Sequence, residues 1–387
     1  MKPADLTLYP DGLYVHLPFC AAICTYCDFA SEVYASARAK KYLPALENEL
    51  RVQVEKLCGK DRFAPRTIFL GGGTPSAFDV HELTQFFDLL DRYVDRTNTI
   101  EFTIEANPGS TEPAKLDLLL KRGVNRISFG VQSFQPQHLK LLGRVHGANQ
   151  GKEAVTLARK AGFDNVSVDL MHGLPQQTAQ NVRDDLQQAI DLGTEHISAY
   201  GLQYEDGTPL KTAIERGVIE RLAPEVETAH YIEVMETLEG AGLPQYEISN
   251  YARPGKEALH NLIYWHNEAY LGVGVSAASY IDGERRTNFY EMDKYMAAAQ
   301  STGEATESSE RLDPAARARE SLVLEWRLRE GLDLAAFSKR WNLDTASLEP
   351  KLTTFIREGL IEKLANGKLR LTRKALPISD GVLSEFV

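Results

Sequence analysis

The sequence predicts an α/β protein with a parallel sheet, followed by a small C-terminal α+β domain. Short apolar runs rich in β-branched and aromatic residues alternate with longer stretches of helical spacing up to about residue 210. This alternation implies a parallel sheet with right-handed crossovers, either open or part of a barrel. A content of 43% hydrophobic and 25% charged residues is typical of a folded, soluble chain.

Six strands and five helices are expected in order along this core, residues 1–210. The strands are GLYVHLPF from Gly12, RTIFLG from Arg66, TIEFTIE from Thr99, NRISFGV from Asn125, NVSVDLM from Asn165 and EHISAYGL from Glu195. The helices are expected at residues 35–57, 80–93, 113–122, 152–161 and 179–192.

Two further regions follow the core. Residues 211–300 are expected to form a family-specific extension, with a helix at 225–241 and then loops and short strands that flank the core. The composition of STGEATESSE, residues 301–310, predicts a linker. Residues 310–387 predict helices at 315–329, 334–341 and 347–358, then a hairpin around Asn366 and Gly367. This order resembles a winged-helix domain.

The charge balance argues against nucleic acid as a partner. The formal net charge is −11, and residues 310–387 carry 14 basic and 12 acidic residues, whereas a nucleic-acid surface is strongly basic. The N-terminus lacks a basic stretch followed by an apolar one, and no apolar run is long enough to cross a bilayer. We therefore expect a cytoplasmic protein that contacts a membrane only through a partner.

Three of the four cysteines lie within eight residues, and this cluster is the most informative feature of the sequence. Cys20, Cys24 and Cys27 follow the first strand, whereas Cys58 stands alone on a predicted helix. Clustered thiols in a reducing compartment indicate a metal or redox site. Three ligands leave one position open, unlike the four of a closed zinc or iron–sulfur site. A zinc site completed by a histidine or by Cys58 is the alternative.

Several polar residues are expected at the carboxyl ends of the predicted strands. Glu105 ends the third strand, Gln132 the fourth and Asp169 the fifth. In parallel α/β folds this edge binds ligands, because positions far apart in sequence converge there. Each of these residues is equally consistent with a turn or a cap, but their coincidence favours a site.

The residues Cys20-Ala-Ala-Ile-Cys24-Thr-Tyr-Cys27 resemble the CxxxCxxC loop of the radical S-adenosylmethionine (SAM) superfamily. In that superfamily the three cysteines hold a [4Fe-4S] cluster whose open iron is chelated by SAM. Gly71-Gly72-Gly73-Thr74-Pro75, after the second strand, looks like the glycine-rich loop that contacts the SAM methionine. Glycines allow such a close backbone approach.

Within the superfamily, the chain resembles the group that contains oxygen-independent coproporphyrinogen III oxidase (HemN) and the haem-binding, chaperone-like HemW, and it is closest to HemW. The likeness covers LYVHLPFC, IEANP, ISFGVQSF, LGRVH, VSVDLMHGLPQQT and YEISNYARPG, among other segments. It implies a partial (β/α)6 barrel. The SAM contacts that it implies are Tyr14, Tyr26, Gly72, Gly73, Thr74, Glu105, Gln132, Arg144 and Asp169.

Two features argue against oxidase activity. The oxidase pattern has another cysteine two residues after the third, where this chain has Phe29, and only 19 residues precede Cys20. HNLIYW, residues 260–265, looks like the HNxxYW motif of HemW, which makes His260 the expected haem ligand and His266 a lower-ranked substitute. A structural, hydrogen-bonded histidine is the alternative. The segment from Gly274 to Ser279 departs from the GxGAHS pattern common in HemW.

We therefore expect a haem chaperone that binds haem, SAM and a [4Fe-4S] cluster and transfers haem to an acceptor such as a respiratory haem protein. The alternative is a radical SAM enzyme that acts on a porphyrin, such as the coproporphyrinogen oxidase, with catalytic residues unassigned. Reduction of the cluster implies a donor such as flavodoxin or ferredoxin. A monomer and a homodimer are both compatible with the sequence.

Overall fold

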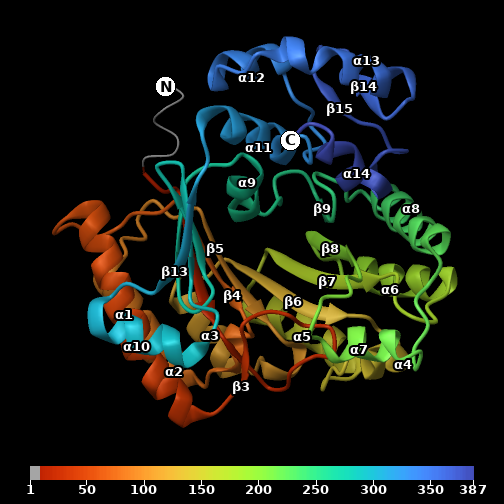
Figure 1. Ribbon diagram of the computed structural model, residues 1–387. Coiled ribbons are helices and arrows are strands. Elements are labelled where there is room, and N and C mark those ends of the chain that lie inside the picture. The colour runs from red at the N-terminus through yellow and green to blue at the C-terminus, as the bar shows by residue number, and fades with distance from the viewer. Residues whose placement is uncertain (1–8) are drawn as a thin grey trace.

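The computed structural model describes residues 9–387, and its centre is one twisted sheet (Figure 1). Among the described residues this sheet has eleven strands in the order β13-β12-β11-β10-β1-β4-β5-β6-β7-β8-β9. The six predicted core strands are confirmed and are parallel neighbours in chain order. They are β1 (Gly12–Leu17), β4 (Thr67–Gly72), β5 (Glu101–Ala106), β6 (Arg126–Gln132), β7 (Val166–His172) and β8 (His196–Gly201).

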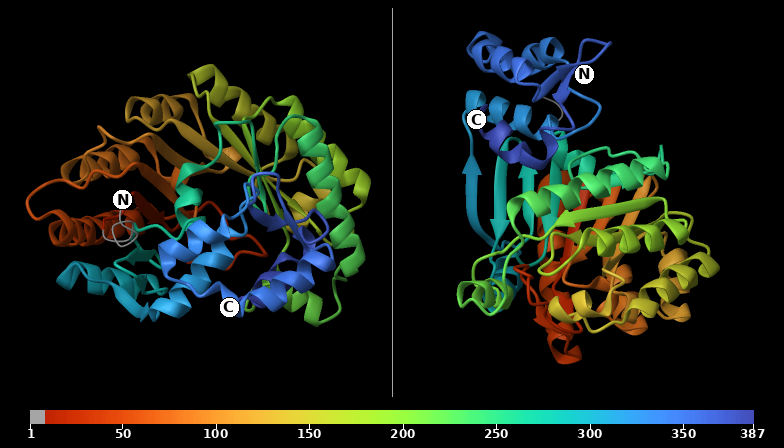
Figure 2. Two further views of the ribbon diagram at one scale, coloured as in Figure 1. Left: turned by 90° about the horizontal axis from the view of Figure 1, so that it is seen from above. Right: turned by 90° about the vertical axis from the view of Figure 1, so that its right-hand side faces the viewer.

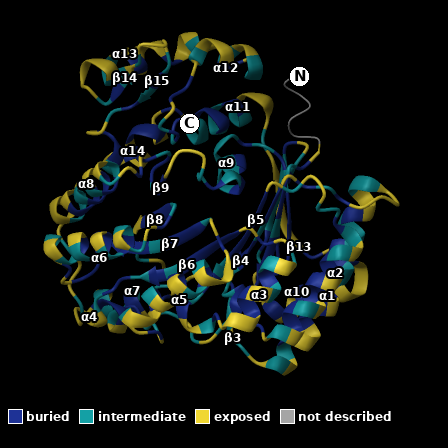
Figure 3. Ribbon diagram, turned by 180° about the vertical axis from the view of Figure 1, so that it is seen from behind, coloured by how far each residue is buried: buried dark blue, intermediate teal, exposed yellow. Residues whose placement is uncertain are grey.

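The five predicted core helices are confirmed and cover the outside of these strands. They are α1 (Ser36–Cys58), α2 (Val80–Tyr93), α3 (Pro113–Lys121), α5 (Ala148–Ala161) and α6 (Ala179–Asp191), with the short α4 (Pro136–Leu141), α7 (Pro209–Glu215), η2 (Pro75–Ala77) and η3 (Pro108–Ser110) between elements. Seen from above, the helices form an arc outside the curved sheet, as a partial (β/α)6 barrel requires (Figure 2). Buried positions concentrate on the strands and exposed ones on the outer helix faces (Figure 3).

Local sequence explains these elements. β1 and β7 are almost wholly buried, which is why they appear in the sequence as near-continuous apolar runs. α2 begins where the Asp79 carboxylate accepts from the Glu82 backbone N–H (2.7 Å) and the Glu82 side chain accepts from the Asp79 N–H. It buries Leu83, Phe86 and Leu90 on one face.

The sheet continues beyond residue 210 and gains strands at both edges. β9 (Asn250–Ala252) pairs antiparallel with β8, while β10 (Tyr270–Val273) pairs parallel with β1. β11 (Ala278–Ile281) and β12 (Glu284–Asn288) follow as antiparallel neighbours. The linker predicted at 301–310 is wrong, because β13 (Thr306–Arg311) pairs antiparallel with β12. This edge strand is fully exposed and is held by backbone hydrogen bonds, which need no apolar side chains.

The predicted helix at 225–241 is α8 (Pro224–Gly240), and two further helices in the extension were not predicted. They are α9 (Leu259–Trp265) and α10 (Met292–Thr302). The N-terminus of α9 is capped from a distance, because the Glu101 carboxylate accepts from the backbone N–H groups of Leu259 (2.8 Å) and His260 (2.9 Å). A cap 158 residues away leaves no local signal.

The predicted order of helices and hairpin at the C-terminus is confirmed. The helices are α11 (Pro314–Glu325), α12 (Leu334–Trp341) and α13 (Glu349–Arg357), with η4 (Thr345–Ser347) between the last two. β14 (Ile361–Lys363) and β15 (Leu369–Leu371) form the hairpin, and η5 (Leu376–Ile378) and α14 (Ser379–Ser384) end the chain. Trp326 packs edge-on against Phe386, with ring centroids 4.7 Å apart. No helix within residues 9–387 has the length and apolar content needed to cross a bilayer.

Candidate functional site

A cavity of about 390 Å³ opens at the carboxyl ends of the core strands. The predicted convergence of strand-end residues is therefore observed, because Glu105, Gln132 and Asp169 all line this cavity. Its walls also contain the other predicted cluster and SAM residues apart from Tyr14, namely Cys20, Cys24, Cys27, Tyr26, Gly72, Gly73, Thr74 and Arg144.

The three cysteines of the loop are free thiols on one side of this cavity. Cys20 ends β2 (Phe19–Cys20), which pairs with β3 (Glu32–Val33). The two ends of the cysteine loop therefore lie side by side. In the part of the chain that the structure describes, no three His, Cys, Asp or Glu side chains are grouped tightly enough for a single metal ion. Cys58 lies outside the cavity, its sulfur 3.4 Å from the Tyr9 hydroxyl.

The glycine-rich loop packs directly against the segment that leads into Cys20. Gly72 has a positive φ of 103°, and a Cβ there would lie 2.5 Å from the His16 ring. A Cβ on Gly73 would lie 2.6 Å from the Pro18 backbone. The Thr74 N–H donates to the Phe19 carbonyl (2.8 Å). Glycine is therefore required for this close approach, which fixes the two loops to each other.

Two partly buried carboxyl groups, Glu105 and Asp169, line the cavity. Burial, and to a lesser degree the neighbouring Asp169, raises the pKa of Glu105 to about 8. The pKa of Asp169 is also raised by burial, although the Ser128 hydroxyl donates to its carboxylate (3.0 Å). Two interacting carboxyl groups in one cavity wall favour a ligand that is cationic or donates hydrogen bonds.

The Arg144 guanidinium is turned toward the cysteine loop. Its Nη1 donates to the Cys24 sulfur (3.2 Å), and its Nη2 donates to the Gly130 carbonyl (2.5 Å). The resemblance to radical SAM proteins predicts a contact with the SAM carboxylate instead. The structure thus adds a contact that the sequence did not indicate.

Tyr14 lies below the cavity, inside the barrel. Its hydroxyl is 3.2 Å from His16 Nδ1, and its ring stacks on Phe69 with centroids 6.1 Å apart. The structure therefore does not bring Tyr14 to the cavity wall with the other predicted SAM residues. Strand periodicity indicates which side of the sheet a residue faces but not its depth in a barrel.

His260 lies at the opposite end of the barrel from the cavity. Its Nδ1 is 2.8 Å from the hydroxyl of Thr67, the first residue of β4, and its Nε2 is 2.8 Å from the Tyr264 hydroxyl. The side chain is 0% exposed, and burial lowers its pKa to about 3. Both ring nitrogens of His260 thus have a hydrogen-bond partner.

His266, which follows α9, is partly exposed, and burial lowers its pKa.

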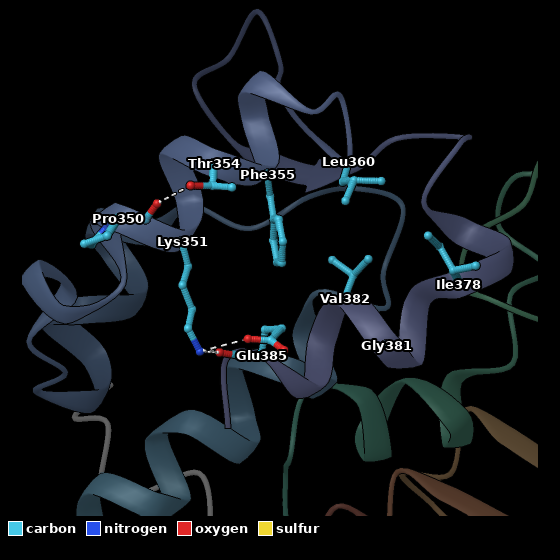
Figure 4. Close-up of a pocket in the computed structure, with 9 residues that line it drawn as sticks. All are labelled: Pro350, Lys351, Thr354, Phe355, Leu360, Ile378, Gly381, Val382 and Glu385. Carbon is cyan, nitrogen blue, oxygen red and sulfur yellow. Dashed lines mark hydrogen bonds and ion pairs between the residues drawn. The ribbon is translucent and has the colours of Figure 1, made fainter.

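A second cavity of about 550 Å³ lies in the C-terminal domain between α13 and α14 (Figure 4). Phe355, Leu360 and Val382 point into it, and Lys351 and Glu385 form an ion pair at its edge (3.2 Å). No thiol or histidine is among the residues that line it.

Two family models match this chain, one over the core and one over the C-terminal domain. The model of the radical SAM superfamily matches residues 14–189, and that of the HemN C-terminal domain matches residues 312–378. The protein named heme chaperone HemW from Bacillus subtilis is 34% identical over 97% of this chain and 98% of its own length. The chain belongs to the HemW family. The HemW protein of Lactococcus lactis is 33% identical over 98% of this chain and 97% of its own.

The fold is also that of a solved member of the group. Coproporphyrinogen III oxidase (HemN) from Escherichia coli superimposes with a TM-score of 0.86 over 99% of this chain and 92% of the oxidase chain, at 23% identity. Membership of the radical SAM superfamily implies a [4Fe-4S] cluster and SAM as cofactors. The residues fit these groups, because three free thiols line a cavity that is also lined by the glycine loop and two partly buried carboxyls.

Three exposed apolar side chains are among the residues that line the cavity. Phe29, where the oxidase pattern has a cysteine, is 63% exposed. We call this group the apolar rim, and it comprises Ile23, Phe29 and Tyr200. The Tyr290 hydroxyl donates to the Asp28 carbonyl (2.9 Å). This bond links the segment just before α10 to the residue that follows Cys27. Exposed apolar patches of this kind mark binding surfaces.

Sequence reasoning missed Tyr200 near the end of β8, and Gln203 and Glu205 beyond it, which all line the cavity. The signal was present, because the strand-end rule applies to the sixth strand as it does to the third, fourth and fifth. Residues 274–279, which depart from the GxGAHS pattern of HemW, form a turn and the start of β11. Ser276, at a glycine of the HemW pattern, has a positive φ of 55°, and Ala278 at the histidine position lies in β11.

We expect SAM binding to weaken as pH falls below about 8. Glu105, with its pKa of about 8, is then protonated, and a neutral carboxyl accepts hydrogen bonds from the hydroxyls of SAM, and attracts a cationic ligand, less strongly than a carboxylate does. The affinity should fall by up to about tenfold per pH unit, measured by calorimetry on the cluster-loaded protein. Glu105→Gln should flatten this dependence, whereas Glu112→Gln, an exposed control, should keep it. A pH-independent affinity in the unmodified chain would contradict the expectation.

Proposed function

We propose that this chain is a haem chaperone, which binds haem and transfers it to an acceptor protein. The observation that carries the proposal is the near full-length identity to proteins named heme chaperone HemW. In this proposal the protein acts in the cytoplasm, the acceptor is a haem protein such as one of the respiratory chain, and a flavodoxin-like or ferredoxin-like protein reduces the cluster.

The mouth of the cavity supports a carrier in preference to an oxidase. Phe29 puts an exposed aromatic ring, and no thiol, beside the cysteine loop. The apolar rim offers a surface for an acceptor protein. Of the N-terminal arm before Cys20, residues 1–8 lie outside the part of the chain that the structure describes.

We propose that His260 is the haem ligand in an open form of the protein. In this form α9 is displaced, so that the His260 ring is released from Thr67 or Tyr264. Neutral imidazole is a common axial ligand, and a low pKa keeps this ring neutral. Because both ring nitrogens are hydrogen-bonded inside the barrel, binding requires the ring to leave Thr67 or Tyr264. Haem affinity should therefore include the free-energy cost of opening α9.

The proposal is tested on anaerobically reconstituted protein in two parallel assays. Haem titration, followed by absorbance, should reach one haem per chain, and His260→Ala should weaken binding more than tenfold, whereas His266→Ala should not. The same preparation with SAM, a strong reductant and coproporphyrinogen III should give no decarboxylated product, with a genuine oxidase as the positive control. Decarboxylation above the blank would overturn the proposal in favour of a radical SAM enzyme, and the absence of haem uptake would also overturn it.

A further inference from the structure

Two side chains of the cavity donate hydrogen bonds to cysteine sulfurs. Arg144 Nη1 lies 3.2 Å from the Cys24 sulfur, and the Thr74 hydroxyl oxygen lies 3.5 Å from the Cys20 sulfur. The second guanidinium nitrogen of Arg144 donates to the Gly130 carbonyl at the end of β6. The guanidinium is thus held between a core strand and the cysteine loop.

The segment that carries Arg144 is bonded to the same loop at further points. The Thr25 N–H donates to the Leu142 carbonyl (3.1 Å), and the Thr25 hydroxyl donates to the Leu141 carbonyl (2.9 Å). Gly143 has a positive φ of 70°, and a Cβ there would lie 3.1 Å from the Thr25 side chain. These contacts therefore fix the spacing between the segment that carries Arg144 and the cysteine loop.

We propose that Arg144, assisted by Thr74, tunes the reduction potential of the cluster through hydrogen bonds to the Cys24 and Cys20 sulfurs. One electron from a low-potential one-electron donor adds one negative charge to the cluster and its thiolates. A permanent cation and a hydroxyl donor stabilise that added charge, because hydrogen bonds to cluster sulfurs raise the potential. This role is additional to SAM binding and does not depend on haem.

The test is a potentiometric titration of reconstituted, SAM-free protein, followed by electron paramagnetic resonance of the reduced form. Arg144→Met should lower the equilibrium constant for reduction about tenfold, which is about 59 mV for a one-electron couple. Arg144→Lys should give a smaller decrease, because it keeps the charge but loses the planar donor geometry. Thr74→Val should lower the potential, and Thr74→Ser should restore it.

Lys140→Met is the matched control, because it removes an exposed cation of the same segment that is not bonded to sulfur. It should leave the potential unchanged. Iron and sulfide analysis checks the loading of every variant, and if Arg144→Met does not retain the cluster, Arg144→Lys and Thr74→Val decide the question. Unchanged potentials in the loaded variants would overturn the proposal. A weaker SAM affinity with an unchanged potential would overturn it too, because Arg144 would then act only on SAM.

Discussion

Replacing Glu49 with alanine is expected to lower the free energy of unfolding by about 3–5 kcal/mol. Glu49 is buried on α1, and its carboxylate accepts from the Gly274 N–H (2.8 Å), the Tyr295 hydroxyl (2.6 Å) and the Asn288 amide (2.6 Å). Alanine would leave these donors without their carboxylate acceptor in the interior. Chemical denaturation monitored by circular dichroism measures the change.

Glu55→Ala is the matched control, because it removes an exposed carboxylate of the same helix that pairs with Arg51. It should cost less than about 1 kcal/mol. A loss below about 1 kcal/mol in Glu49→Ala would contradict the expectation.

Burial raises the pKa of Glu49 to about 7, above its unfolded value of 4.5. The folded state therefore binds this proton more tightly, so the contribution of Glu49 to stability is largest below pH 4.5 and decreases as pH rises through 7.

The core of the fold was predictable because its signals are local. Each strand is an apolar run buried on both faces, and each helix has one buried face, so sequence periodicity alone locates them. The positions of Glu105, Gln132 and Asp169 at one cavity then followed from the parallel order of the strands.

The elements that sequence reasoning missed depend on distant partners. β13 is polar and fully exposed, and only its hydrogen bonds to β12 make it a strand. α9 begins where Glu101, from the core sheet, caps it. The contact between Arg144 and Cys24 likewise joins residues 120 positions apart. None of these pairings leaves a periodic pattern in the sequence.

His260 shows a limit of a motif match. The HNxxYW pattern picks out an imidazole, but only the structure shows that this ring is fully buried at the amino ends of the strands, away from the cavity. The proposed haem ligand and the proposed cluster therefore lie at opposite ends of the barrel. Haem bound at His260 would not contact SAM, which favours a carrier over an enzyme that acts on a porphyrin.

Tyr264→Phe is expected to strengthen haem binding, although Tyr264 belongs to the haem motif itself. The substitution removes the partner of His260 Nε2 in the closed form and leaves that buried nitrogen unsatisfied. An unsatisfied buried group costs about 1–3 kcal/mol, so the open form becomes more populated and the apparent affinity rises about 5- to 150-fold. Haem titration of the variant against the unmodified chain measures the change.

Tyr270→Phe is the matched control, because Tyr270 packs on Tyr264 with centroids 4.6 Å apart and has no hydrogen bond to His260. It should bind haem as the unmodified chain does. Thr67→Val, which removes the partner of Nδ1 without changing side-chain shape, should act in the same direction as Tyr264→Phe. An affinity that is unchanged or weaker in both Tyr264→Phe and Thr67→Val would mean that His260 stays closed, as a structural residue that joins α9 to β4. The haem iron would then need another ligand, and partly exposed His266 is the next candidate on the chain.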